Sequence, residues 1–209
     1  MNINLNQAQW INQAQHFTVS RESITITTEP NTDLWQRTYY GFQHDNAPAI
    51  LLTSDLNFSF TTKVSFKYQA RFDQAGVMIY IDRYNWFKAS IEYENTDMSR
   101  LGSVVTNHGY SDWATTDIST ISSIWYRLSR RGADFLIEHS LNGKDFKQMR
   151  ISHLSALGDT DATASQLAPT AILAHPVRFG IYACSPLDSS FTATFENLSL
   201  TDSLWMAHD

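Results

Sequence analysis

The sequence predicts an all-β fold, a sandwich of two antiparallel sheets. Three observations lead to this prediction. Apolar and polar residues alternate in about a dozen short stretches, the pattern of half-buried strands. Turn residues separate these stretches at regular spacing, and no long amphipathic helix pattern interrupts them. Aromatic residues make up 13% of the chain, and aromatic side chains favour pleated surfaces.

Composition favours one globular domain over residues 1–209, with 43% hydrophobic residues to form its core. A formal net charge of −6 without a basic patch makes nucleic acid and anionic membranes poor partners. The single cysteine, Cys184, cannot form an intramolecular disulfide and is expected to be a small buried side chain. No signal peptide or membrane helix pattern is found. We therefore expect a cytoplasmic protein.

The first third of the chain contains four predicted strand regions. Alternation predicts strands at 23–28 and 33–42, and a short apolar strand at 49–52. Continuous alternation over 56–68 predicts one long bent strand or two strands joined by a bulge. The segment 10–17 has weak periodicity and is expected to cover other elements.

The clearest element is residues 66–93, predicted as three consecutive antiparallel strands. The odd-numbered residues from 77 to 93 are mostly apolar, so they predict one buried face. A tight turn at 83–85 would pair Tyr80 with Lys88. The opposite face is polar and aromatic, and it carries Tyr80, Asp82, Trp86, Lys88, Ser90 and Glu92.

Further strands are predicted at 102–107, 125–130, 135–139, 146–151, 177–184 and 191–200. Asn142-Gly143 lies between two of them and indicates a hairpin, because a tight turn there needs positive φ. Residues 111–113 are expected in a loop or at a strand edge. Residues 158–170 are rich in Asp, Thr, Ala and Ser, and we expect a flexible surface loop.

An ordered set of motifs resembles the bacterial and fungal family known as domain of unknown function 1349, which includes the fungal regulation-of-enolase protein. The motifs are Asp33 to Phe42, Asp73 to Met78, Asn85 to Lys88, Tyr110 to Trp113, Arg127 to Arg130 and Tyr182 to Pro186. The resemblance covers about residues 10–200. It implies a concanavalin A-like jelly-roll sandwich, the fold of legume lectins, laminarinases and sugar-binding modules. It supplies no catalytic residues, and a fold alone does not define a function.

We expect a ligand-binding surface on the concave sheet. Solvated sheet faces rarely gather Tyr80, Trp86 and Lys88, although an ordinary solvated face is the alternative. Aromatic rings stack on sugar C–H faces, while carboxylates and amides bind hydroxyls. Trp86 and Lys88 lie off the core face, so we expect their replacement to leave folding intact. The candidate binding residues are Trp35, Arg37, Asp73, Gln74, Tyr80, Trp86, Lys88, Glu92, Asp112, Trp113, Arg127 and Tyr182.

The leading functional hypothesis is a non-catalytic, lectin-like domain that binds a saccharide or sugar phosphate and needs no cofactor. The alternative is a glycoside hydrolase in which Glu92 acts with a second carboxylate. Glu94 lies about 7 Å along the strand, a spacing that suits an inverting enzyme, but Glu94 is expected in the turn. A regulatory protein-interaction module is a third hypothesis, by analogy with the fungal relative. The seven histidines lack metal-ligand spacing, so no metal site is expected.

Overall fold

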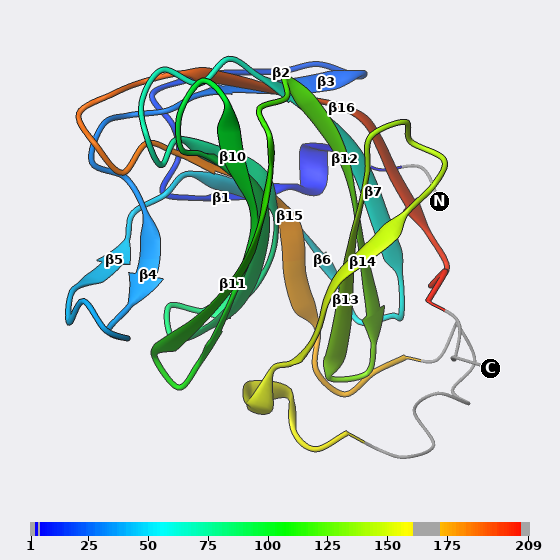
Figure 1. The fold of residues 1–209 in the computed structure, drawn as a ribbon. Coiled ribbons are helices and arrows are strands. Elements are labelled where there is room, and N and C mark those ends of the chain that lie inside the picture. The colour runs from blue at the N-terminus through cyan, green and yellow to red at the C-terminus, as the bar shows by residue number, and fades with distance from the viewer. Residues whose placement is uncertain (1–2, 4, 161–171, 206–209) are drawn as a thin grey trace.

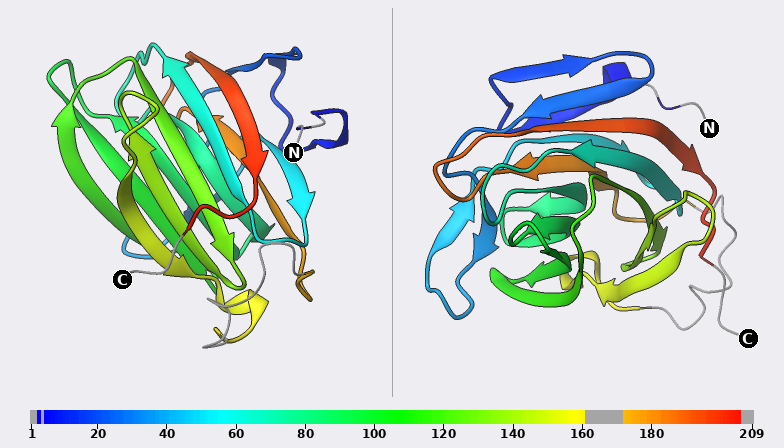
Figure 2. Two further views of the ribbon diagram at one scale, coloured as in Figure 1. Left: turned by 90° about the vertical axis from the view of Figure 1, so that its right-hand side faces the viewer. Right: turned by 45° about the horizontal axis from the view of Figure 1, so that its top comes forward.

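The computed structural model describes residues 3, 5–160 and 172–205, and it shows a β-sandwich (Figure 1, Figure 2). Two sheets of seven strands each form its layers. Within the described residues, helix is limited to two short 3-10 turns, η1 (Leu5–Gln7) and η2 (Ser155–Leu157). Neither turn in this part of the chain is long and apolar enough to cross a membrane. The predicted all-β sandwich is confirmed.

The first sheet contains β1 (Gln9–Ile11), β6 (Ala49–Ser54), β8 (Gln74–Asp82), β9 (Asn85–Tyr93), β10 (Met98–Asn107), β11 (Tyr110–Ser119) and β15 (Val177–Cys184). The second sheet contains β2 (His16–Val19), β3 (Ser23–Thr27), β7 (Ser59–Phe66), β12 (Ser123–Arg131), β13 (Asp134–Ser140), β14 (Lys147–His153) and β16 (Thr192–Thr201). A separate hairpin pairs β4 (Leu34–Gln36) with β5 (Gln43–Asp45).

The strand orders are β1-β6-β15-β8-β9-β10-β11 in the first sheet and β14-β13-β12-β7-β16-β3-β2 in the second. Neighbouring strands are antiparallel throughout both sheets. Strands distant in sequence therefore lie side by side, and β15 separates β6 from β8. This order places the central hairpin β8–β9 in the middle of the first sheet.

The main core lies between the two sheets. Five predicted core residues of β8 and β9 are buried, namely Val77, Ile79, Phe87, Ala89 and Ile91. Ile81, also predicted for the core, is only partly buried. They meet aromatic residues of both sheets, and the ring centroids of Phe58 and Phe179 are 4.1 Å apart. The even-numbered residues of β8 and β9 therefore point to the opposite face of the first sheet.

The predicted register of the β8–β9 hairpin is wrong by two residues. Tyr80 pairs with Trp86 rather than Lys88, and Lys88 pairs with Met78. The connection is only Arg83-Tyr84, and a register irregularity between Tyr80 and Asp82 accommodates it. Because the shift is even, every side chain stays on its predicted face.

Two further strand predictions are corrected. β7 ends at Phe66 and belongs to the second sheet, so residues 66–93 are not three consecutive strands of one sheet. Residues 33–42 do not form one strand, because β4 ends at Gln36. The chain then turns through positive φ at Arg37, Tyr39 and Gly41 and returns as β5.

The other predicted elements are found with shifted ends. The alternating region 56–68 is the single strand β7, and residues 111–113 lie inside the edge strand β11. The segment 10–17 contributes to the edge strands β1 and β2. The hairpin around Asn142-Gly143 joins β13 and β14, with positive φ at Gly143 alone of the two. The predicted loop 158–170 lies largely outside the described residues.

The β4–β5 hairpin stands beside the concave face of the first sheet (Figure 1, and the right-hand view of Figure 2). A second apolar cluster joins the hairpin to that face. The cluster includes Leu34 of β4, Met78 of β8, Trp86 of β9 and Tyr182 of β15, all of them buried. The hairpin therefore covers part of a sheet face that would otherwise be open to solvent.

Candidate functional site

A pocket of about 480 Å³ lies between the concave face of the first sheet and the β4–β5 hairpin. Its volume falls within the range of about 300–1,000 Å³ that is usual for small-molecule sites. The hairpin side forms a largely aromatic wall, and the sheet forms a polar floor. The lining residues used below are Asp33, Trp35, Tyr40, Phe42, His44, Phe72, Gln74, Lys88, Ser90, Glu92, Gly102 and Trp113.

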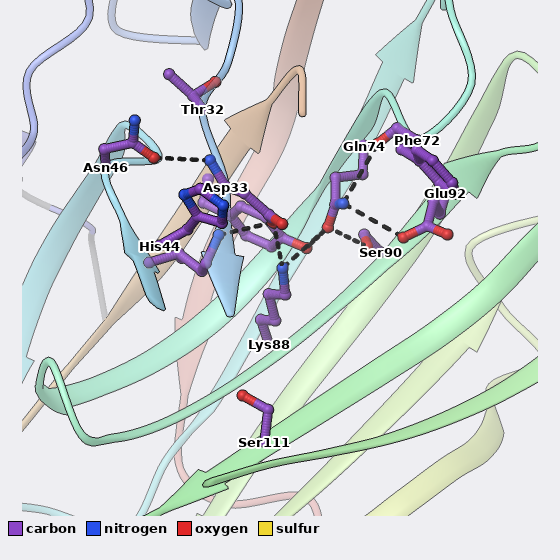
Figure 3. Close-up of polar contacts among 12 residues, drawn as sticks. Thr32, Asp33, His44, Asn46, Phe72, Gln74, Lys88, Ser90, Glu92 and Ser111 are labelled. Atoms are coloured by element: carbon purple, nitrogen blue, oxygen red, sulfur yellow. Dashed lines mark hydrogen bonds and ion pairs between the residues drawn. The ribbon is translucent and has the colours of Figure 1, made fainter. Parts of the chain in front are cut away.

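The amide of Gln74 organises the polar floor (Figure 3). Its Oε1 accepts hydrogen bonds from Lys88 Nζ at 3.1 Å, from Tyr182 OH at 3.0 Å and from Ser90 Oγ at 3.5 Å. These side chains meet because Gln74, Lys88 and Ser90 share the even-numbered face of β8 and β9. Donors from two neighbouring strands, β9 and β15, thus fix the orientation of the amide.

Lys88 links the floor to the hairpin. Its side chain is 5% exposed, and its Nζ lies 3.4 Å from Asp33 Oδ1 at the start of the hairpin. The ammonium also lies 5.7 Å from the ring centroid of Trp86 and 5.4 Å from that of Tyr182. A buried ammonium needs this kind of pairing, since an unpaired buried charge is strongly unfavourable.

Glu92 is the pocket's least satisfied polar group. Its Oε2 accepts a hydrogen bond of 3.3 Å from Gln74 Nε2, whereas its Oε1 is buried without a hydrogen-bond partner. Burial raises the pKa of Glu92 to about 7, against a smaller lowering by Lys88. At neutral pH the group is therefore present in both protonation states. It can accept a hydrogen bond from a bound molecule.

An aromatic wall lines the hairpin side of the pocket. Trp35 and Tyr40 meet edge to face with ring centroids 5.5 Å apart. Tyr40 and Phe42 stack at 5.1 Å, and Phe42 lies 4.6 Å from His44. Tyr40 and Phe42 are 53% and 42% exposed, so they contribute little to either apolar cluster. Exposed aromatic side chains gathered at a pocket indicate a contact surface for a ligand.

Trp113 of β11 forms the opposite side. A Cβ at Gly102 would lie 3.1 Å from Trp113 Nε1, so the glycine leaves room for the indole over β10. The guanidinium of Arg100 lies 5.5 Å from the Trp113 ring centroid. The pocket therefore has aromatic side chains on both sides of its polar floor.

Five of the predicted site residues line this pocket: Trp35, Gln74, Lys88, Glu92 and Trp113. The other seven do not. Their positions show why alternation alone misplaced them.

The prediction that Trp86 offers an exposed stacking platform is wrong. Trp86 is fully buried beneath the hairpin, and its Nε1 donates to Arg83 O at 3.3 Å. Tyr182 is also fully buried and acts on the pocket through its bond to Gln74 and through its ring contact with the Lys88 ammonium. Tyr80 is 8% exposed, with the Arg178 guanidinium 4.8 Å from its ring centroid.

Asp73 and Arg37 make structural contacts. The Asp73 carboxylate accepts hydrogen bonds from the backbone amides of residues 69–70 at 2.8 and 2.9 Å, and from Ser189 Oγ at 2.6 Å. It therefore holds two loops together. Arg37 Nη1 donates to Gly109 O at 2.9 Å, which ties the hairpin turn to the β10–β11 connection.

Arg127 and Asp112 lie away from the pocket. Arg127 is on the second sheet, where its guanidinium forms two hydrogen bonds of 2.6 and 2.7 Å with the Glu138 carboxylate. Asp112 pairs with Arg150 of β14 at 2.9 Å, and its side chain is 73% exposed. Neither residue faces the floor formed by β8, β9 and β10.

Sequence reasoning missed Asp33, Tyr40, Phe42, His44 and Phe72. Tyr40 and Phe42 were assigned to a continuous strand, whereas a turn brings them back toward Trp35. The glycine between them, Gly41, was the available signal for a turn. Among the described residues, no three His, Cys, Asp or Glu side chains are arranged to hold a metal ion.

Residues 10–203 match the family described as protein of unknown function (DUF1349). The chain belongs to this family. The resemblance seen in the motifs is thus confirmed. The DUF1349 chain is also 30% identical over 210 residues to "Regulation of enolase protein 1" from Saccharomyces cerevisiae, covering 100% of this chain and 96% of the relative.

Solved structures similar to this DUF1349 chain share its fold. A functionally unknown protein from Saccharomyces cerevisiae has a TM-score of 0.81 and 27% identity, covering 97% of this chain and 100% of the other. The GH43 protein BlXynB from Bacillus licheniformis has a TM-score of 0.70 and 16% identity over 97% of this chain and 38% of its own. The carbohydrate-binding module CBM66 from Bacillus subtilis has a TM-score of 0.52 and 14% identity, covering 91% and 94%. The jelly-roll sandwich is therefore confirmed.

Proposed function

We propose that this protein binds a saccharide in the pocket between the first sheet and the β4–β5 hairpin, without catalysing its conversion. The observation that carries the proposal is the combination of an exposed aromatic wall with a hydrogen-bonding floor. As part of this proposal we keep the cytosolic location expected from the sequence.

The chemistry of a sugar ring suits both sides of the pocket. The ring carries an apolar C–H face, which packs against the electron-rich face of an aromatic ring. Tyr40, Phe42 and Trp113 are placed for that contact. The hydroxyls need donors and acceptors, and Gln74 and Glu92 offer them on the floor. Similarity in fold to a carbohydrate-binding module supports the proposal.

Isothermal titration with a set of soluble oligosaccharides tests the proposal. Hits from a saccharide array would be titrated into the wild type and into Tyr40→Ala and Phe42→Ala. Both side chains are largely exposed, so the variants should melt close to the wild type. Each should bind about 5–10-fold more weakly, since loss of an aromatic contact removes about 1 kcal/mol or more.

Tyr110→Ala is the matched control. Tyr110 is 62% exposed and belongs to β11, but it does not line the pocket. Its replacement should leave the affinity unchanged. Equal losses in all three variants, or binding by none of the array saccharides, would reject the pocket as a saccharide site.

Hydrolysis of a glycoside is the second candidate function, because Glu92 has a pKa raised by burial to about 7, as a general acid requires. Glu94 cannot be its partner in the pocket, since its carboxylate contacts Arg71 and Arg100. Asp33 is the other carboxylate among the described lining residues. Release of a reducing sugar from the bound oligosaccharide, lost in Glu92→Gln, would favour this candidate over simple binding.

A further inference from the structure

The positive charge in the pocket is already paired with a carboxylate of the protein. Among the described residues that line it, Lys88 carries the permanent positive charge. Its Nζ contacts Asp33 Oδ1 at 3.4 Å and Gln74 Oε1 at 3.1 Å. Two of its three N–H donors are engaged, and its charge is balanced by a carboxylate. An anionic ligand would have to displace one of these contacts.

The unpaired oxygen of Glu92 favours a ligand that donates a hydrogen bond. Its Oε1 is buried and has no hydrogen-bond partner, so the ionised carboxylate lacks a donor at that point. A sugar hydroxyl can supply that donor. A fully ionised carboxylate or phosphate group cannot, and it would bring a further negative charge toward Glu92 and Asp33 in a poorly hydrated space.

We propose that the pocket selects uncharged saccharides against uronic acids and sugar phosphates, and that Glu92 is the residue that makes this distinction. The inference rests on the proposed function, and it names the ligand class of the same site. Specificity of this kind needs a repulsive element as well as attractive contacts, and Glu92 provides both.

The charged groups around Glu92 come from several elements. Lys88 lies on β9 with it, Glu94 follows the end of β9, Asp33 precedes β4, and Arg100 lies opposite on β10. Arg100 is held by Glu94 at 3.4 Å. His44 of β5 also lines the pocket.

The sign of the pH dependence distinguishes the two ligand classes. Burial holds the pKa of Glu92 at about 7, so its negative charge develops as the pH rises through neutrality. An uncharged saccharide that donates to the carboxylate then binds more tightly. A uronic acid, already ionised in this range, binds more weakly because it meets a growing negative charge.

Matched pairs of methyl glycosides test the inference. We would titrate the protein with the methyl glycosides of glucose, galactose and mannose and with the methyl glycosides of the corresponding uronic acids, whose carboxyl groups stay free. Glucose 6-phosphate would be titrated in the same way. Binding would be followed by NMR at pH 5.5, 7 and 8.5. At pH 8.5 the uncharged glycoside that binds best should bind at least tenfold more tightly than its uronide. Glu92→Gln should reduce this ratio to below threefold and flatten both pH profiles. A pH slope of unchanged size in this variant would mean that another group makes the distinction, and it would overturn the role of Glu92.

Asp112→Asn is the matched control, since it makes the same carboxylate-to-amide change outside the pocket and should keep the discrimination. Thermal melts establish that each variant is folded. Equal binding of a glycoside and its uronide, or discrimination that survives in Glu92→Gln, overturns the inference while leaving saccharide binding intact. If no glycoside, uronide or oligosaccharide binds the wild type, the proposed function fails and the inference fails with it.

Discussion

Glu92 opposes folding in the empty protein. Its pKa rises from 4.5 to about 7, mainly because burial disfavours the carboxylate. The folded chain therefore holds this proton more tightly than the unfolded chain, and stability falls as the pH rises from about 4.5 to 7. Above pH 7 the whole penalty is present, and a shift of this size corresponds to at most about 3 kcal/mol.

Glu92→Gln should therefore stabilise the protein in a pH-dependent way. We expect a gain of about 1–3 kcal/mol in unfolding free energy at pH 8, because the amide cannot ionise. The gain should shrink toward zero at pH 4.5. Urea denaturation at pH 4.5, 6 and 8 measures it. A gain of equal size at all three pH values would mean that packing, not ionisation, is responsible.

Trp86 belongs to the second apolar cluster. Its replacement should therefore lower the stability of the fold rather than act on ligand affinity alone. It is fully buried between β9 and the hairpin. Trp86→Ala should cost about 3–5 kcal/mol of stability. Tyr40→Ala, at an exposed position, should cost less than about 1 kcal/mol. Thermal unfolding of both variants compares these values, and a wild-type melt for Trp86→Ala would contradict the observed burial.

At the scale of elements, the β4–β5 hairpin depends on contacts with the first sheet. Its own strands are three residues each, too short to be stable alone. From the floor, Lys88 contacts Asp33 (Figure 3). Gln36 N donates a hydrogen bond of 2.9 Å to Ser111 Oγ of β11. The rigidity of the aromatic wall thus depends on these two contacts together with the Arg37–Gly109 bond and the second apolar cluster.

Lys88→Met should loosen the hairpin while keeping the sandwich. The change keeps an unbranched side chain, one heavy atom shorter, but leaves Asp33 without its ammonium partner. We expect amide hydrogen exchange in residues 34–45 to become at least about tenfold faster, with exchange in β13 unchanged. Arg127→Met removes an ion pair from the second sheet and is the control that should spare the hairpin. Uniformly faster exchange in Lys88→Met would show a global loss of stability instead.

Strand existence was predictable because alternation of apolar and polar residues marks which face of a strand packs against the core. The strands over 177–184 and 74–93 follow their sequence pattern closely. Their register was not, since a shift of two residues leaves the same residues facing the core. The β4–β5 hairpin was missed because its turn has positive φ at Arg37 and Tyr39. Arginine and tyrosine rarely adopt positive φ, so neither residue indicates such a turn.

At the scale of the whole molecule, the floor of the site was predictable and its cover was not. Gln74, Lys88 and Glu92 share one face of adjacent strands, and that follows from parity alone. Whether Trp86 on the same face is exposed depends on a hairpin about 50 residues earlier in the chain. No local pattern in β9 carries that information, so long-range packing decided which predicted residues reach the ligand space.

Cys184 reports on the integrity of the whole fold. It is fully buried in the second apolar cluster, and burial raises the pKa of its thiol. The thiol should therefore fail to react with Ellman's reagent in the native protein and react fully in denaturant. Melting temperatures should not depend on added reductant. Rapid reaction of the folded protein would show that the cluster opens far more readily than its packing implies.

The position of the aromatic hairpin separates recognition from architecture. It lies in the connection between β3 of one sheet and β6 of the other, and its exposed rings belong to neither apolar cluster. Substitution of these exposed rings can therefore reshape the pocket without disturbing the strands beneath it. If the proposed saccharide site is correct, the residues that choose the ligand and the residues that form the sandwich core belong to different parts of the chain.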